Sequence, residues 1–270
     1  MEIRPLANRI KCHRTIHGVV ALSAILVLIY SFSVDIRASR GASITGDEPF
    51  YLLTTQSLIE DGDLDLVNQY RDKSYVSFFD HADPLWYQSV PRDDGRLLSP
   101  HNPGLSVFLI PGFAAAGLIG AQAQLVLVAA LTFALAYLLS VAITGAKLES
   151  WLVTFGVGLS ATAFIYSSEV YPEVPAAALL LTGLLILTRP GKLEVWPAMG
   201  LVLCVVGMMW LGVKYAPLGV VLIGVSAYRA STVGRMTILL SAGTLAIPYV
   251  LFHLATFGEL TPYNVNVVYA

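Results

Sequence analysis

The chain has 270 residues, of which 56% are hydrophobic and only 13% are charged, and its mean hydropathy is +0.70. A water-soluble domain of this length would need far more polar surface, so the composition predicts an all-α integral membrane protein. The formal net charge is only −2, and we expect the lipid bilayer, and no nucleic acid, as a partner.

The first 34 residues combine a basic tail, residues 1–16, with an apolar run at 17–34. This run is long for the core of a signal peptide, and it lacks a clear small-residue cleavage site. We therefore predict a cytoplasmic tail followed by an uncleaved first transmembrane helix. The two cysteines, Cys12 and Cys204, are not placed to form a disulfide and do not resemble a metal cluster.

Six further runs, within residues 122–254, are strong enough to span the membrane: 122–144, 151–168, 172–188, 195–213, 215–228 and 236–254. Residues 103–120 are ambiguous, because two prolines and four glycines weaken any helix there. If this segment does not span, the short basic connections all fall on the side of the basic N-terminus. We therefore predict seven spans, with a juxtamembrane helix near 103–120 that lies along or dips into the outer leaflet, and with 255–270 as an extracytoplasmic tail.

The first outer loop, residues 35–121, is long enough to fold over the membrane face and is acidic. Within it, Thr45 and Glu48 have capping-box spacing and Gly62 supplies a stop, so we predict a juxtamembrane helix at 47–61. Its partly apolar face would suit the membrane interface. Asp47 and Glu48 have two compatible interpretations: they cap the helix and complement its dipole, or they accept a proton or bind a cation.

The order "GDEPFYLLTTQSLIEDGDLDL", "HNPGLSVFLIPG" and "YSSEVYPEVPAAALLLTGLLIL" after a first span resembles the GT-C superfamily of polytopic glycosyltransferases. The resemblance is to the branch with protein O-mannosyltransferases and lipid A aminoarabinose transferases, and it covers about residues 15–260. It implies an inverting enzyme that takes a sugar from a polyprenyl-phosphate carrier on the extracytoplasmic face. Family members continue beyond the seventh span, so the chain is expected to correspond to their N-terminal module.

By position in the family motif, the resemblance implies that Asp47 is the general base or orients the acceptor, with Glu48 beside it. Sugar transfer also requires positive charge near the departing phosphate. Lys214, at the predicted outer end of the fifth span, is the candidate for that role. Simple snorkelling of Lys214 to the interface is an equal alternative.

Other candidates for substrate binding follow from position. Glu169, Tyr171 and Glu173 lie at the outer junction of two spans and are candidates for substrate binding. One of the two acids could position the acceptor, but the favoured interpretation of each is a solvated loop carboxylate. His101 could contact the phosphate.

Asp80, His81 and Asp83 form a weak candidate for a divalent-cation site without diagnostic spacing. No cofactor is implied with certainty.

The leading hypothesis is a glycosyltransferase in the inner (plasma) membrane, with its N-terminus cytoplasmic and its active site extracytoplasmic, acting on an unknown protein, lipid or glycan acceptor. The alternative is a noncatalytic protein of the same fold that binds polyprenyl phosphate or acts as a scaffold. A transporter is less favoured, because no matching pair of broken helices is visible and the acids cluster in the outer loop.

Overall fold

The structure, a computed structural model, describes residues 13–36 and 44–264. All regular structure in these ranges is helical, apart from isolated bridge residues at Ser89 and in the pair Leu193 and Ala230. The predicted all-α class is therefore confirmed for the described part of the chain. Residues 1–12 and 265–270 of the two predicted tails lie outside the described residues.

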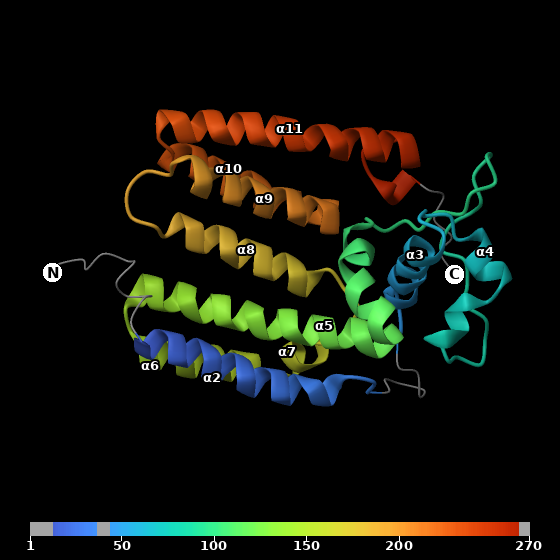
Figure 1. The fold of residues 1–270 in the computed structure, drawn as a ribbon, viewed down its shortest axis with the longest axis horizontal. Coiled ribbons are helices and arrows are strands. Elements are labelled where there is room, and N and C mark those ends of the chain that lie inside the picture. The colour runs from blue at the N-terminus through green and yellow to red at the C-terminus, as the bar shows by residue number, and fades with distance from the viewer. Residues whose placement is uncertain (1–12, 37–43, 265–270) are drawn as a thin grey trace.

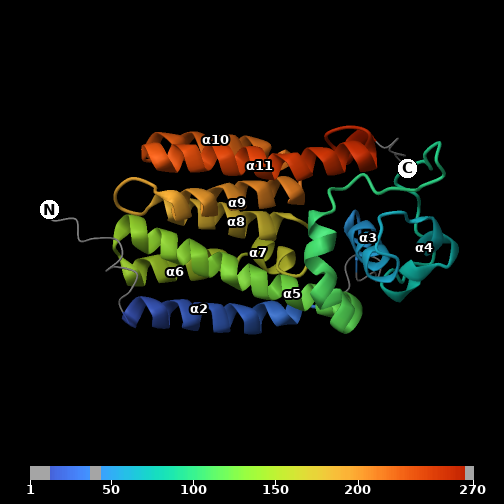
Figure 2. The ribbon, with the colours of Figure 1, turned by 45° about the horizontal axis from the view of Figure 1, so that its top comes forward.

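The long helices lie side by side and form a bundle (Figures 1 and 2). They are α2 (His13–Tyr30), α5 (Gly104–Thr144), α6 (Lys147–Gly158), α8 (Glu173–Leu187), α9 (Val195–Leu211), α10 (Ala216–Arg229) and α11 (Thr232–Phe257). Three helical segments are long and apolar enough to cross a membrane, namely His13–Ser33, Gly104–Thr144 and Thr232–Phe257; α8 and α9 are shorter apolar helices. The chain therefore has the helices of a membrane protein.

The predicted spans 17–34, 122–144 and 236–254 coincide with these three segments. The predicted span 151–168 is instead divided between α6 and α7 (Ala161–Tyr166). The division occurs at Ser160, whose extended backbone leaves the helix and whose Oγ accepts a hydrogen bond from the Ala163 N–H at 3.2 Å. Such N-capping starts a new helix.

Helix α5 is interrupted inside the segment 103–120 whose placement was ambiguous. Ala116 and Gly117 leave helical geometry, and Gly117 takes φ 58° and ψ −139°. The arm before the break lies at one end of the bundle beside α3, while the arm after it runs along the bundle (Figure 1). The predicted separate helix at 103–120 is thus present, but it begins at Gly104 and breaks near 116, because the sharp turn requires a glycine there.

Gln124, in the second arm of α5, forms hydrogen bonds to the backbone of the first arm. Its Oε1 accepts from the Gly112 N–H at 2.9 Å, and its Nε2 donates to the Phe108 carbonyl at 2.7 Å. One side chain of the second arm thus bonds two backbone groups of the first arm. Where lipid excludes water, backbone groups need such internal partners.

One end of the bundle is covered by the segment 44–103, which we call the cap (Figure 1). It contains α3 (Glu48–Glu60), α4 (Val67–Arg71) and η3 (Ser74–Ser77). The predicted helix 47–61 is confirmed to within one residue at each end. The predicted one-sided apolar face is not observed: side chains on all sides of the first two turns are buried, because α5 packs closely against α3 and Ser106 bonds the Tyr51 carbonyl.

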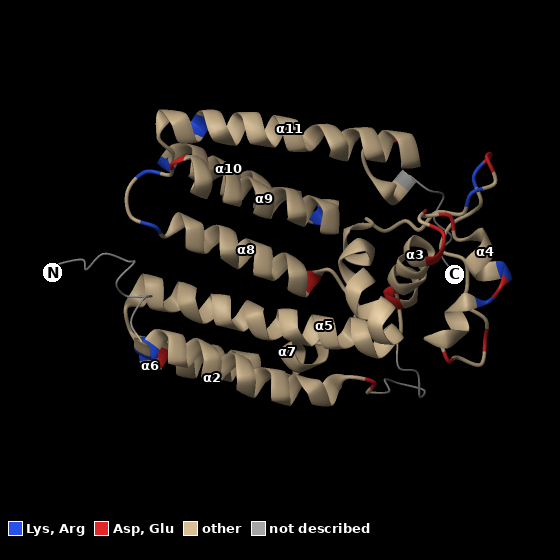
Figure 3. Ribbon diagram, in the orientation of Figure 1, with Lys and Arg blue, Asp and Glu red and all other residues tan. Residues whose placement is uncertain are grey.

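Basic residues gather at the opposite end, which we call the basic end (Figure 3). They lie in or beside the connections that follow α5, α8 and α10, and they are Lys147, Arg189, Lys192, Arg229 and Arg235. Arg229 fastens two of these connections, because its Nη2 donates to the carbonyls of Arg189 at 2.7 Å and Gly191 at 3.1 Å. α2 also begins at this end (Figure 1). The basic connections and the start of α2 therefore lie at the same end, as expected if residues 103–120 do not cross the membrane.

Candidate functional site

Glu48 ties the start of α3 to the connection between α7 and α8. Its Oε2 accepts from the Thr45 N–H and its Oε1 from the Val170 N–H, both at 2.8 Å, and the residue is only 4% exposed. Only half of the predicted capping box forms, because the Thr45 hydroxyl does not cap the helix and Asp47 occupies the N-cap position without a side-chain bond. Glu48 therefore links two segments that are far apart in the sequence.

The burial of Glu48 raises the pKa of its carboxyl to about 7, although the two backbone N–H groups lower it and the Glu169 charge adds to the rise. Burial disfavours the charged form, whereas hydrogen bonds to it act in the opposite direction.

Asp47, beside Glu48, points into a more open environment, with a side chain that is 48% exposed. Its Oδ1 accepts from Gln88 Nε2 at 2.8 Å and lies 3.7 Å from His101 Nε2. Its backbone N–H donates to the Tyr171 hydroxyl at 3.3 Å. Asp47 is thus oriented by several neighbours while its carboxylate remains accessible.

His101 is the buried neighbour of Asp47. Its ring stacks on Tyr51 with centroids 4.6 Å apart, and its side chain is 16% exposed. Burial lowers the pKa of His101, the Lys214 charge lowers it further, and Asp47 partly opposes both. The imidazole is therefore neutral at neutral pH and can donate or accept one hydrogen bond.

Lys214 and Glu173 complete the site from the bundle side. Lys214 Nζ lies 2.5 Å from Glu173 Oε1, and both side chains are roughly half exposed. The Lys214 charge acts on His101, and the charges of Asp47 and Glu173 both raise the pKa of Tyr51, whose burial is the largest cause of the rise. The charge of Asp47 thus acts on both stacked rings, while Lys214 acts on His101 and Glu173 acts on Tyr51.

Glu169 lines a cavity of about 240 Å³ together with Glu48, Ser33 and Gln122. Burial and the charge of Glu173 raise the pKa of its carboxyl. The structure therefore brings together residues of the cap and of the bundle that were predicted from the sequence. They are Asp47, Glu48, His101, Glu169, Tyr171, Glu173 and Lys214.

The weak metal candidates do not join this group. His81 stacks on Phe79 with centroids 4.4 Å apart. The described residues contain no group of three or more His, Cys, Asp or Glu side chains that could hold a metal ion. A cation at Asp80, His81 and Asp83 remains a prediction.

Sequence reasoning missed three contributors. Gln88 orients Asp47, and the Tyr51 ring stacks on the His101 ring. The Nε2 atom of the fully buried His253 lies 3.3 Å from Asn102 Nδ2. The one available signal was His253 itself, a polar residue within a long apolar run.

An apolar groove of about 680 Å³ lies beside the site, between the two arms of α5 and helices α8 and α9. Pro175 and Leu211 line it, two residues after Glu173 and three before Lys214. A long hydrocarbon chain in this groove would have its polar end next to the ion pair.

No family model matches the chain, and neither a curated protein nor a solved structure shows significant similarity to it.

Proposed function

We propose that the chain is a membrane glycosyltransferase that moves a sugar from a polyprenyl-phosphate donor to an extracytoplasmic acceptor with inversion. The observation that carries this proposal is that Asp47 and Lys214 both act on His101, beside an apolar groove. Asp47 lies 3.7 Å from the His101 ring, and the Lys214 charge lowers the pKa of that ring. A carboxylate, an ammonium group and a lipid-sized groove are the three features that this reaction requires.

In the proposed reaction, the polyprenyl chain occupies the groove and its phosphate approaches Lys214. The acceptor hydroxyl oxygen attacks the anomeric carbon, and its proton passes to the Asp47 carboxylate. The bond between the anomeric carbon and the phosphate oxygen breaks, and polyprenyl phosphate leaves with the electron pair, stabilised by the Lys214 ammonium group. Gln88 keeps Asp47 in position through its hydrogen bond to Oδ1.

The proposed topology has seven spans, with the basic end in the cytoplasm and the cap outside the inner membrane. The basic residues in the short connections at one end support this orientation. α10 and the α6–α7 pair, which are short for a bilayer of ordinary thickness, would rely on their neighbours in the bundle.

The noncatalytic alternative is favoured by one observation: Lys214 already has a carboxylate partner, so a phosphate must compete with Glu173 for it. Under that alternative the protein binds polyprenyl phosphate without transferring a sugar.

Two measurements test the proposal. Native mass spectrometry of the protein extracted gently from its host membranes should find a co-purified polyprenyl-phospho-sugar. The purified protein, given that lipid and a host membrane extract as acceptor, should transfer the sugar, and Asp47→Asn should reduce the rate by about 10²- to 10⁴-fold without loss of lipid binding.

Asp93→Asn serves as the matched control, because Asp93 is an exposed acid of the same cap. An active Asp47→Asn variant would remove Asp47 as the base. Lipid binding without transfer in the unmodified protein would support the noncatalytic alternative.

A further inference from the structure

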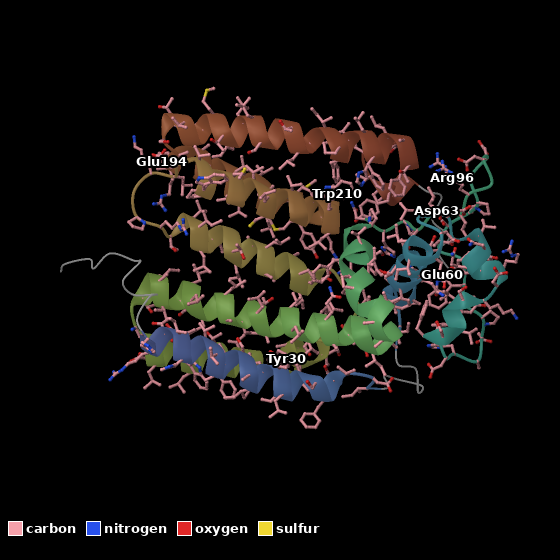
Figure 4. The ribbon with its side chains drawn as sticks, viewed as in Figure 1. Tyr30, Glu60, Asp63, Arg96, Glu194 and Trp210 are labelled. Atoms are coloured by element: carbon pink, nitrogen blue, oxygen red, sulfur yellow. The ribbon has the colours of Figure 1, made fainter. Side chains whose placement is uncertain are left out.

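A second cavity, of about 380 Å³, lies at the cap end of the bundle, between loops of the cap and the ends of α9 and α11. Its lining combines apolar and charged side chains, including Leu98, Trp210 and Phe252 on the one hand and Asp63, Asp65 and Arg96 on the other. Figure 4 labels Trp210 at the end of α9, with Asp63 and Arg96 on the loops beyond it. None of these residues belongs to the group around His101, although Trp210 also lines the apolar groove assigned to the donor lipid.

The charged side chains are held by their own loops and retain free atoms. Asp63 Oδ1 accepts from Ser57 Oγ and the Asp65 N–H, both at 3.0 Å. Asp65 Oδ1 accepts from the N–H groups of Val67 at 3.2 Å and Leu97 at 2.8 Å.

Arg96 uses Nε and Nη2 to bind Asp94, at 2.9 and 2.7 Å. The remaining atoms, Asp63 Oδ2, Asp65 Oδ2 and Arg96 Nη1, have no hydrogen bond within the part of the chain that the structure describes.

This set of free atoms fits a neutral ligand. Because Asp94 pairs with Arg96, and because Asp63 and Asp65 each accept two hydrogen bonds from other residues of the cap, these charges do not depend on a counter-ion from the ligand. Two free acceptors and one free donor match hydroxyl groups, which both donate and accept. The aromatic side chains of Trp210 and Phe252, which line the cavity, match a ligand with one apolar side. A sugar ring has both properties.

The cavity is linked to the Asp47 site along two short stretches of chain. Gln88 bonds Asp47, and the next residue, Ser89, donates through Oγ to the Leu98 carbonyl at 2.5 Å. His101 lies beside Asp47, and Pro103 two residues later lines the cavity. A ligand in the cavity is therefore close to the proposed base.

We propose that this cavity binds a neutral carbohydrate ring of the acceptor, so that the acceptor is a glycan. The assignment to the acceptor rests on the proposed function, whereas the binding of a carbohydrate in the cavity can be tested without any transfer reaction.

The test uses the full chain in lipid nanodiscs, because glycoside detergents would occupy a sugar site. Tryptophan fluorescence is recorded during titration with methyl glycosides of glucose, mannose, galactose and N-acetylglucosamine. We expect a saturable change with at least one of them. Trp210→Phe should abolish the change, and Trp196→Phe, at the other end of the same helix, should retain it. Asp63→Asn should weaken binding roughly tenfold.

The absence of a saturable change with all four glycosides, or a change that persists in Trp210→Phe, would overturn the inference. Binding of a lysine-rich peptide in place of the glycosides would also overturn it, in favour of a basic acceptor. Failure of the proposed function would look different: glycosides would bind as expected, but sugar transfer would be absent or would survive Asp47→Asn.

Discussion

The two ends of the bundle use charge in different ways. The cap carries eleven of the 18 acidic residues, and some of its polar groups, such as Glu48 and Asn102, are buried among apolar side chains. At the basic end, the charged side chains stay in contact with solvent, and Arg229 bonds only backbone carbonyls. Buried charge is costly and exposed charge is not, so the cap is the end where charge needs an explanation beyond topology.

Removing the ammonium group of Lys214 is the strongest test of the difference between the two ends. Lys214→Met keeps the apolar stem, and we expect it to lower the rate of sugar transfer by about 100-fold, because the leaving phosphate loses its positive partner. The melting temperature should change little, since a half-exposed ion pair contributes about 1 kcal/mol or less. Lys192→Met at the basic end is the control, and an equal loss of transfer in that variant would contradict the distinction between the two ends.

The pH dependence of stability tests the burial of Glu48. Because its pKa rises from 4.5 to about 7 in the folded protein, the folded state holds a proton that the unfolded state releases. The stabilising contribution is complete below the ordinary pKa and is lost as the pH rises through about 7. We expect the free energy of unfolding to fall by up to about 3 kcal/mol between about pH 5 and about pH 8.

Glu48→Gln should remove most of this pH dependence, and Glu169, whose pKa is also raised, should supply the remainder. The variant should also be less stable at neutral pH by roughly 1–3 kcal/mol, because an amide oxygen cannot serve both backbone N–H groups and one is left unpaired. Thermal melts over the pH range measure both effects. An unchanged pH slope in Glu48→Gln would assign the titration to other groups.

Gly117→Ala tests the break in α5, at the junction of cap and bundle. An added Cβ would meet nothing within 4 Å, so any loss of stability reports the backbone conformation alone. We expect a loss of about 1–3 kcal/mol. Gly243→Ala, in open space inside α11, is the control and should be neutral or slightly stabilising. Equal effects would mean that the break does not depend on a left-handed residue.

The smallest effect is expected at the basic end. Arg229→Gln removes two hydrogen bonds from an exposed side chain, so we expect a loss of less than about 1 kcal/mol and unchanged sugar transfer. A large loss of transfer would show that this end also contributes to the reaction.

The sequence predicted the helices well where hydrophobicity alone determines them, as at 122–144 and 236–254. It did not predict the break at Gly117 or the division at Ser160, because these depend on local backbone geometry inside apolar runs. Boundary positions of this kind are the weakest part of a pattern-based prediction.

The candidate site was predicted in part for a similar reason. Asp47 and Lys214 could be named because charges beside apolar runs are conspicuous. The linking role of Glu48 could not be predicted, because it depends on the N–H of Val170, 122 residues away. The cavity at Trp210 likewise joins residues from four separate parts of the chain, and no local pattern marks it.

The short arm of α5 has a consequence for how the protein is made. Residues 104–115 number twelve, which at 1.5 Å each gives a helix of about 18 Å, too short to cross a bilayer whose apolar core is about 30 Å thick. This arm therefore cannot cross the bilayer by itself. We expect it to leave the insertion machinery together with the residues around Gln124, so that insertion of the two arms is a single event.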